Sequence, residues 1–122
     1  MLYVQRLDRL DAQALPGTEG AANPFFSPDG KWVAFYAAGA LRKVPAAGGG
    51  VSVVCDTEAS RGGSWAADGN IVFSTRSGLW RVPAAGGPAE RLTTVQPGEP
   101  IPMYPQVLPG GQVLYSAAVD NN

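Results

Sequence analysis

The chain has few residues that could do chemistry, and none has a partner suited to catalysis. Asp29 and Asp68 recur 39 residues apart, and paired carboxylates can hold a metal ion or transfer protons. Each is followed directly by a glycine, Gly30 or Gly69. An aspartate followed by glycine is typical of a tight turn, because glycine supplies the positive φ that closes the bend. We therefore predict turn residues here rather than an acid pair.

The remaining candidate nucleophiles and ligands are isolated. The chain contains no histidine, which removes Ser-His-Asp and Cys-His catalysis and imidazole metal sites. Cys55, the single cysteine, alternates with Val51 and Val53, so we predict a small buried apolar residue. The closing Asp120-Asn121-Asn122 could belong to a cation loop, but a frayed terminus or a cut hairpin explains it better. No candidate base exists for Ser27, Ser64 and Ser74. We expect no catalytic residue, no cofactor and no metal.

Composition bears on the classes of partner. Nine Lys and Arg are balanced by ten Asp and Glu, scattered singly, so no basic stripe exists to neutralise nucleic-acid phosphates. No apolar run approaches the roughly 18 residues of a membrane-spanning helix. The first six residues lack the apolar core of a signal peptide. We therefore expect no nucleic-acid partner and no membrane contact by this chain itself.

An internal repeat organises the chain. Val-Pro-Ala-Ala-Gly-Gly at residues 44–49 recurs at residues 82–87, 38 residues later. Such a period, near 40 residues, is typical of an architecture in which one supersecondary unit is copied and stacked. Sixteen Gly and eleven Pro favour many short strands joined by tight turns.

Three segments of the repeat can be laid over one another: residues 26–35, 65–73 and 107–115. In each, a large apolar residue lies four positions before a glycine, and an apolar triplet follows. Such a triplet is expected in a strand sandwiched between two layers. The triplets are Val33-Ala34-Phe35, Ile71-Val72-Phe73 and Val113-Leu114-Tyr115. The predicted hairpin turns contain Pro28, Asp29, Gly30, Asp68, Gly69, Gly110 and Gly111.

A second hairpin follows the first in each unit. Residues 41–44 and 79–82 are predicted strands, and residues 51–55 and 90–94 return beside them. Residues 2–4 match the third strand of a unit and residues 12–15 its fourth, while after residue 100 only the first two strands recur. No stretch has a capped helical period. We therefore predict an all-β chain of twelve antiparallel strands.

Four-stranded units of about 40 residues with Ser27-Pro28-Asp29-Gly30 between the first two strands resemble blades of TolB-type β-propellers, relatives of WD repeats. Residues 15–20 and 106–111, Leu-Pro-Gly-Thr-Glu-Gly and Gln-Val-Leu-Pro-Gly-Gly, are similar to the propeller that follows the kinase domain and membrane helix in many bacterial receptor-type serine/threonine kinases. The chain departs from this pattern at Ala66-Ala67-Asp68-Gly69, where the Ser-Pro of the turn is lost.

The resemblance covers essentially the whole chain and implies a single partial β-propeller domain over residues 1–122. It divides into a half blade at 1–20, blades at 21–60 and 61–100, and a half blade at 101–122. These parts add up to three blades, which cannot form a ring, since propellers close with about four to eight blades. Either the chain is a piece of a longer gene product, or two copies join head to tail into a homodimer with a six-bladed ring.

The resemblance also implies a function. We expect a non-enzymatic recognition or scaffold module that binds a protein, peptide or small ligand. It would be the sensor part of a larger bacterial protein such as a receptor-type serine/threonine kinase, in a periplasmic or extracytoplasmic compartment. The alternative is the gating propeller of a prolyl-oligopeptidase-like or dipeptidyl-peptidase-like hydrolase whose catalytic domain is absent here. The candidate channel-side ligand contacts are Phe26, Trp65 and Tyr104.

Overall fold

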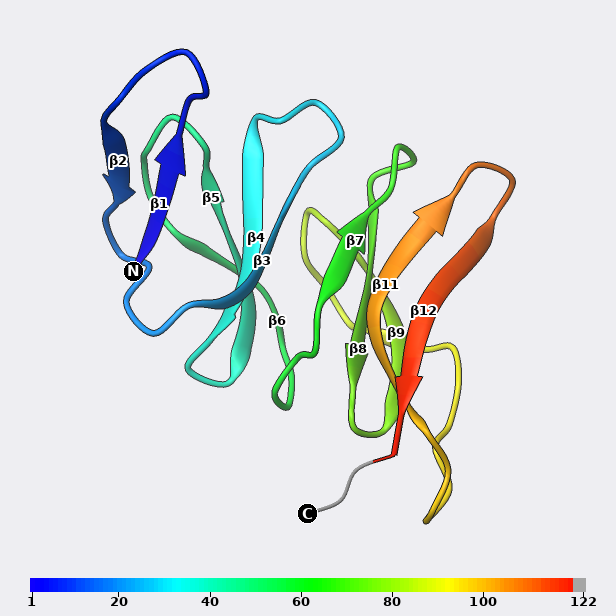
Figure 1. Cartoon of the computed structure of the whole chain (residues 1–122). Helices are drawn as coiled ribbons and strands as arrows, with labels where there is room; N and C mark the ends of the chain where they lie inside the picture. Colours follow the sequence, from blue (N-terminus) through cyan, green and yellow to red (C-terminus); the bar gives the residue numbers. More distant parts are fainter. Residues whose placement is uncertain (120–122) are drawn as a thin grey trace.

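The computed structural model describes residues 1–119 and contains strands without helices over that range (Figure 1). Both the all-β class and the twelve strands predicted from sequence are confirmed. The strands are β1 (Leu2–Gln5), β2 (Ala12–Leu15), β3 (Ala22–Phe26), β4 (Trp32–Ala37), β5 (Ala40–Pro45), β6 (Ser52–Asp56), β7 (Gly63–Trp65), β8 (Asn70–Thr75), β9 (Gly78–Pro83), β10 (Glu90–Arg91), β11 (Ile101–Leu108) and β12 (Gln112–Ala118). Asp120-Asn121-Asn122 lies outside the described residues.

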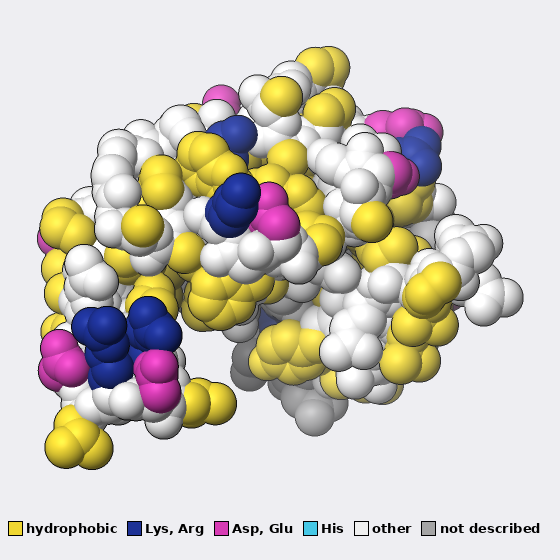
Figure 2. Space-filling view, turned by 90° about the horizontal axis from the view of Figure 1, so that it is seen from above, with side chains coloured by type: hydrophobic (Ala, Val, Ile, Leu, Met, Phe, Trp, Pro, Cys, Tyr) yellow, Lys and Arg dark blue, Asp and Glu magenta, His cyan; other side chains and the backbone are white. Residues whose placement is uncertain are grey.

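The strands form four antiparallel sheets in chain order. The hairpin β1-β2 comes first, the sheets β3-β4-β5-β6 and β7-β8-β9-β10 follow, and the hairpin β11-β12 comes last. Within each sheet, strands that are consecutive in the chain are neighbours, because short turns join them. From above, the molecule is an arc with a hollow on one side (Figure 2).

The fourth strand of the second large sheet is shorter than predicted. Residues 90–94 were expected to pair, but β10 contains only Glu90 and Arg91. The backbone amides of Leu92 and Thr93 still donate to the carbonyl of Leu79, at 2.8 and 3.3 Å. The amide of Leu79 donates instead to the Thr93 hydroxyl, at 2.9 Å. A side chain therefore replaces the backbone acceptor, and the regular ladder ends.

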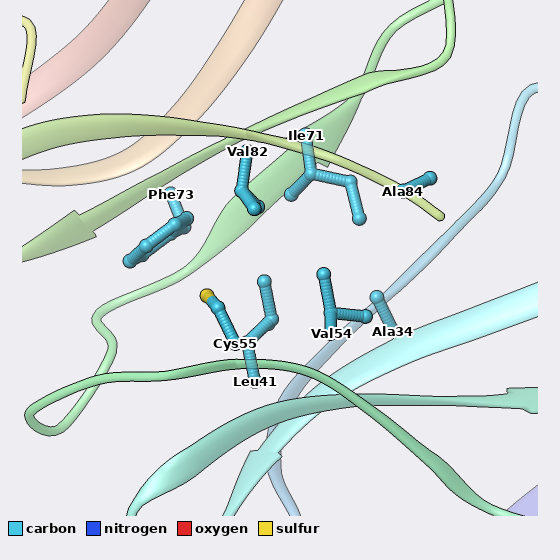
Figure 3. Packing of buried hydrophobic residues seen from close by; sticks show 8 residues of the cluster. All are labelled: Ala34, Leu41, Val54, Cys55, Ile71, Phe73, Val82 and Ala84. Atoms are coloured by element: carbon cyan, nitrogen blue, oxygen red, sulfur yellow. The ribbon is translucent and has the colours of Figure 1, made fainter. Parts of the chain in front are cut away.

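Two apolar clusters hold the first three sheets together. One lies between hairpin β1-β2 and sheet β3–β6, where Leu15, Val33 and Phe35 are buried. The other lies between the two four-stranded sheets, and Figure 3 shows its side chains pointing toward one another from both sides. Its members are Ala34, Leu41, Val54, Cys55, Ile71, Phe73, Val82 and Ala84. Sheet β3–β6 is thus covered on both faces, as its apolar triplet requires.

The last hairpin differs from the two large sheets. The first two triplets are buried, with Phe35 and Phe73 both at 0 % exposure. In β12, by contrast, Leu114 is 57 % exposed and Tyr115 is 47 % exposed. The prediction that this strand is sandwiched is therefore wrong for the chain alone. The physical reason is that β12 pairs only with β11, and no other described strand packs extensively against its faces.

Candidate functional site

The first strands β3 and β11, and the residues directly before the first strand β7, carry a similar backbone irregularity. Asn23, Gly62 and Tyr104 have positive φ values of 54°, 105° and 51°. In β3 and β11 this residue lies in a register shift, between Ala22 and Phe25 and between Met103 and Gln106. Before β7, the Arg61 amide donates to the Ser74 carbonyl at 2.8 Å and the Ser74 amide donates to the Gly62 carbonyl at 3.1 Å, so two residues again oppose one. One extra residue against the neighbouring strand is a β-bulge, which redirects the strand and its side chains.

The bulge before β7 and the bulge of β11 touch one another. The amide of Tyr104 donates to the carbonyl of Arg61 at 2.8 Å. A Cβ added at Gly62 would lie 2.9 Å from both the Cα and the Cδ1 of Tyr104, so only glycine allows this approach. On the other side, the Asn23 side-chain amide donates to the carbonyl of Ser60 at 2.9 Å. The three bulges are therefore held side by side.

Together the bulges line a depression of about 340 Å³, close to the lower end of the usual range for ligand pockets. Tyr104 is 57 % exposed beside it, and the side-chain amides of Asn23 and Gln106 add hydrogen-bonding groups. None of its lining residues is Asp, Glu, Lys or Arg. The lining is Asn23, Pro24, Gly62, Gly63, Tyr104, Pro105 and Gln106. Such a surface suits a neutral polar group that stacks on an aromatic ring and exchanges hydrogen bonds.

The three aromatic residues predicted to be channel-side do not come together. Tyr104 lies in the depression, whereas Phe26, at the end of β3, is 54 % exposed outside it. Trp65 is half-buried against the apolar cluster between the large sheets and lines a separate groove with Trp32 at the end that carries the aspartate turns. The sequence prediction missed Asn23 and Gln106, because no motif distinguishes them.

Asp29 and Asp68 are engaged in their own turns. The Asp29 carboxylate accepts hydrogen bonds from the Ser27 hydroxyl at 2.6 Å and the Lys31 amide at 3.0 Å. These bonds, the one from Ser27 first, hold the pKa of Asp29 below its ordinary value. Asp68 likewise accepts from the Asn70 amide at 3.0 Å. Of the turn glycines, Gly30, Gly69, Gly110 and Gly111 all have positive φ.

The serine and cysteine side chains considered as nucleophiles are either hydrogen-bonded within the fold or buried. The Ser27 hydroxyl also accepts from the Trp32 amide at 3.0 Å, and that of Ser64 accepts from the Val107 amide at 3.1 Å. Ser74 is fully buried. Cys55 is buried in the core cluster, and burial, helped by Asp56, raises the pKa of its thiol. A thiol in such a place is a weak nucleophile at neutral pH.

A second polar cluster surrounds Glu58. Its carboxylate accepts from both the hydroxyl and the backbone amide of Ser77. Nearby, the indole N–H of Trp80 donates to the Thr75 hydroxyl at 3.1 Å, and the Arg91 guanidinium lies 4.7 Å from the Trp80 ring centroid. The hydrogen bond from Ser77 is the main reason that the pKa of Glu58 lies below its ordinary value of 4.5.

Glu58 therefore predicts a pH dependence of stability. A carboxyl whose pKa is lowered by folding stabilises the fold above its ordinary pKa, and this contribution is lost as the pH falls through the folded value. We expect Glu58→Gln to lower the free energy of unfolding near pH 7 by less than about 1 kcal/mol, because the group is exposed. Denaturation at about pH 7 and about pH 3 should show a larger acid-induced loss in the wild type than in the variant. Equal losses would contradict the assignment.

Two general properties complete the description. Residues 1–119 include no group of three or more His, Cys, Asp or Glu side chains placed to hold a metal ion. They also include no helix that could cross a bilayer. No protein-family model matches the chain, and no curated protein matches it. The depression and the strands that position it are the features that bear on function.

Proposed function

We propose that the chain is part of a β-propeller that works as a non-enzymatic recognition module. The observation that carries this is the repeated bulge, found in the first strands β3 and β11 and, by its hydrogen bonds, directly before the first strand β7. In a propeller the first strand of each blade lies closest to the central axis. The bulges at Asn23, Gly62 and Tyr104 would then face one channel, and the depression between them would be its wall.

The chemistry of the depression favours an uncharged polar segment as ligand. Tyr104 offers an exposed ring, and Asn23 and Gln106 offer amides that both donate and accept. An extended peptide has alternating N–H and C=O groups that match such amides, and its side chains can stack on the ring. We therefore propose a protein or peptide partner, bound by the sensor part of a larger bacterial protein such as a receptor-type kinase.

A selection of peptides tests this proposal. A phage-displayed library of random peptides is panned against the wild-type chain, and the affinity of selected peptides is measured by titration. Tyr104→Ala should weaken binding at least about tenfold, because exposed aromatic anchors dominate interfaces of this kind. Alanine at position 104 must adopt the same positive φ as tyrosine, so the substitution should leave the bulge itself unchanged.

The matched control is Phe26→Ala. Phe26 is 54 % exposed against 57 % for Tyr104, but it does not line the depression. Its replacement should leave peptide affinity within about twofold, as expected for a residue outside an interface hot spot. If selection yields no peptide, or if Tyr104→Ala binds as tightly as the wild type, the proposed site is wrong.

A further inference from the structure

The two end hairpins each contain only two of the four strands of a complete sheet, and together they contain all four. β1-β2 and β11-β12 lie at opposite ends of the row of sheets (Figure 1), and each is a sheet of two strands beside neighbours of four. Their apolar side chains remain open to solvent: Tyr3 is 64 % exposed, Leu114 57 % and Tyr115 47 %. Such unpaired strand edges with apolar side chains are sites at which another chain adds.

The last hairpin corresponds to the first two strands of a large sheet. In β11-β12, Gln106 lies opposite Leu114 and Val107 opposite Val113. In β3-β4, Phe25 lies opposite Ala34 and Phe26 opposite Val33. The bulge precedes these pairs in both sheets. Thus β12 is the counterpart of β4, and Leu114 and Tyr115 are the counterparts of Ala34 and Phe35.

The first hairpin corresponds to the last two strands. Leu2 lies opposite Leu15 in β1-β2, just as Leu41 lies opposite Cys55 in β5-β6. In the second large sheet the Leu92 amide donates to the Leu79 carbonyl in the same way. Thus β1 is the counterpart of β5 and β9, and the edge that it leaves free is the one that those strands use to pair with β4 and β8.

We propose that two copies of this chain join so that β12 of each pairs with β1 of the other, completing two further four-stranded sheets. The inference rests on the propeller architecture proposed above, in which the result is a closed six-bladed ring with a two-fold axis. The depression would then form part of a channel lined by first strands of both copies. A second copy is the occupant to expect because it supplies both missing halves at once.

The register of the large sheets predicts which residues meet. Ala34 lies opposite Lys43 and Phe35 opposite Arg42, so Leu114 should lie opposite the partner's Val4 and Tyr115 opposite the partner's Tyr3. Within each copy, Val4 packs against the cluster that contains Val33 and Phe35. Leu114 of one copy would extend that cluster in the other copy. In the completed sheet, the pair of Tyr115 and the partner's Tyr3 would correspond to Phe73 and Trp80 of the second large sheet, whose ring centroids lie 6.5 Å apart.

The solution mass of the purified 122-residue chain is the first test. Light scattering coupled to size exclusion should show a single species of twice the chain mass of 12.6 kDa. A monomer at micromolar concentration overturns the proposal, and so does a ladder of larger assemblies, which would mean a head-to-tail contact that does not close. A monomer that still binds peptides through Tyr104 overturns the pairing alone and leaves the recognition site intact.

A substitution at the free edge gives the second test. Leu114→Lys should shift the mass to that of one chain, because a lysine would be buried beside the partner's Val4. Val53→Lys is the matched control, since Val53 is 51 % exposed on an outer strand that the pairing does not use. Circular dichroism checks that both variants remain folded. A dimer that survives Leu114→Lys, or is lost equally in Val53→Lys, overturns the proposed interface.

A crosslink provides a positive result that does not depend on disruption. The positive φ of both Ala38 and Gly39 defines a two-residue hairpin turn, after which hydrogen-bonded and non-hydrogen-bonded pairs alternate. Counting from that turn, Ala34 and Lys43 form a non-hydrogen-bonded pair, so Leu114 and the partner's Val4 should come within disulfide reach. Val4→Cys combined with Leu114→Cys should give a covalent dimer on mild oxidation.

Each single cysteine variant serves as the control for this crosslink, because Cys55 is buried and should not react. A covalent dimer in a single variant, or a disulfide within one chain of the double variant, overturns the proposed register.

Discussion

Replacement of Phe73 by alanine is expected to lower the free energy of unfolding by about 3–5 kcal/mol. Phe73 is 0 % exposed and belongs to the cluster between the two four-stranded sheets, with Leu41, Cys55 and Val82 (Figure 3). Its ring also stacks on Trp80. Since domains of this size have about 5–15 kcal/mol in total, the variant should lose a large fraction of its stability.

Urea denaturation followed by tryptophan fluorescence measures this loss, and Phe26→Ala is the matched control. Phe26 is 54 % exposed at the end of β3, so its truncation should cost less than about 1 kcal/mol. Equal losses for the two phenylalanines would show that the sheets do not pack through the cluster seen in Figure 3.

The strands were predictable because local rules and packing agree. An apolar triplet such as Ile71-Val72-Phe73 follows a turn whose glycine, Gly69, has the required positive φ of 88°. A period of 38 or 39 residues then places the same strand in the next unit. Where the two levels disagree, the prediction fails. At Thr93 a side-chain hydroxyl takes over a backbone hydrogen bond, and the expected strand over residues 90–94 shrinks to two residues.

The exposure of β12 shows what an apolar pattern does and does not predict. Val113-Leu114-Tyr115 has the same character as the two buried triplets, yet Leu114 is 57 % exposed. The pattern indicates that a strand is suited to burial on both faces. It does not indicate whether the covering strand belongs to the same chain. In the proposed dimer, pairing with β1 of a second copy would bring that copy's sheet β3–β6, on which its β1-β2 hairpin packs, over β12 as the missing layer.

The candidate site was less accessible to sequence reasoning. Tyr104 was placed in a first strand, but a bulge inserts one residue and reverses the alternation of side chains beyond it. Both Asn23 and Tyr104 precede a proline, and residues before proline favour extended backbone. Their φ values of 54° and 51° run against that preference. Tertiary contacts therefore decide their conformation, among them the Asn23–Ser60 hydrogen bond and the approach of Tyr104 to Gly62.

Gly78→Ala is the second substitution expected to have a large effect. Gly78 has a φ of 138°, in a region that is nearly exclusive to glycine and costs other residues about 1–3 kcal/mol. A Cβ there would also lie 2.2 Å from the carbonyl oxygen of Thr93. That carbonyl cannot retreat freely, because the Thr93 hydroxyl accepts from Leu79 and the Thr93 amide donates to the Leu79 carbonyl.

The loss for Gly78→Ala should therefore combine backbone strain with the breaking of this connection, about 3 kcal/mol or more in total. Gly39→Ala is the control that isolates strain: Gly39 also has positive φ, 77°, but nothing lies within 4 Å of an added Cβ. Its cost should be about 1–2 kcal/mol.

Thermal denaturation separates the two glycine variants, and hydrogen exchange at the Leu92 and Thr93 amides reports the local break. The Gly78 variant should exchange faster at both amides, while the Gly39 variant should match the wild type there. Equal melting temperatures for the two variants would mean that the segment after β10 moves away from the added methyl group without a further loss of stability. In that case Thr93 would not anchor the outer edge of the second large sheet.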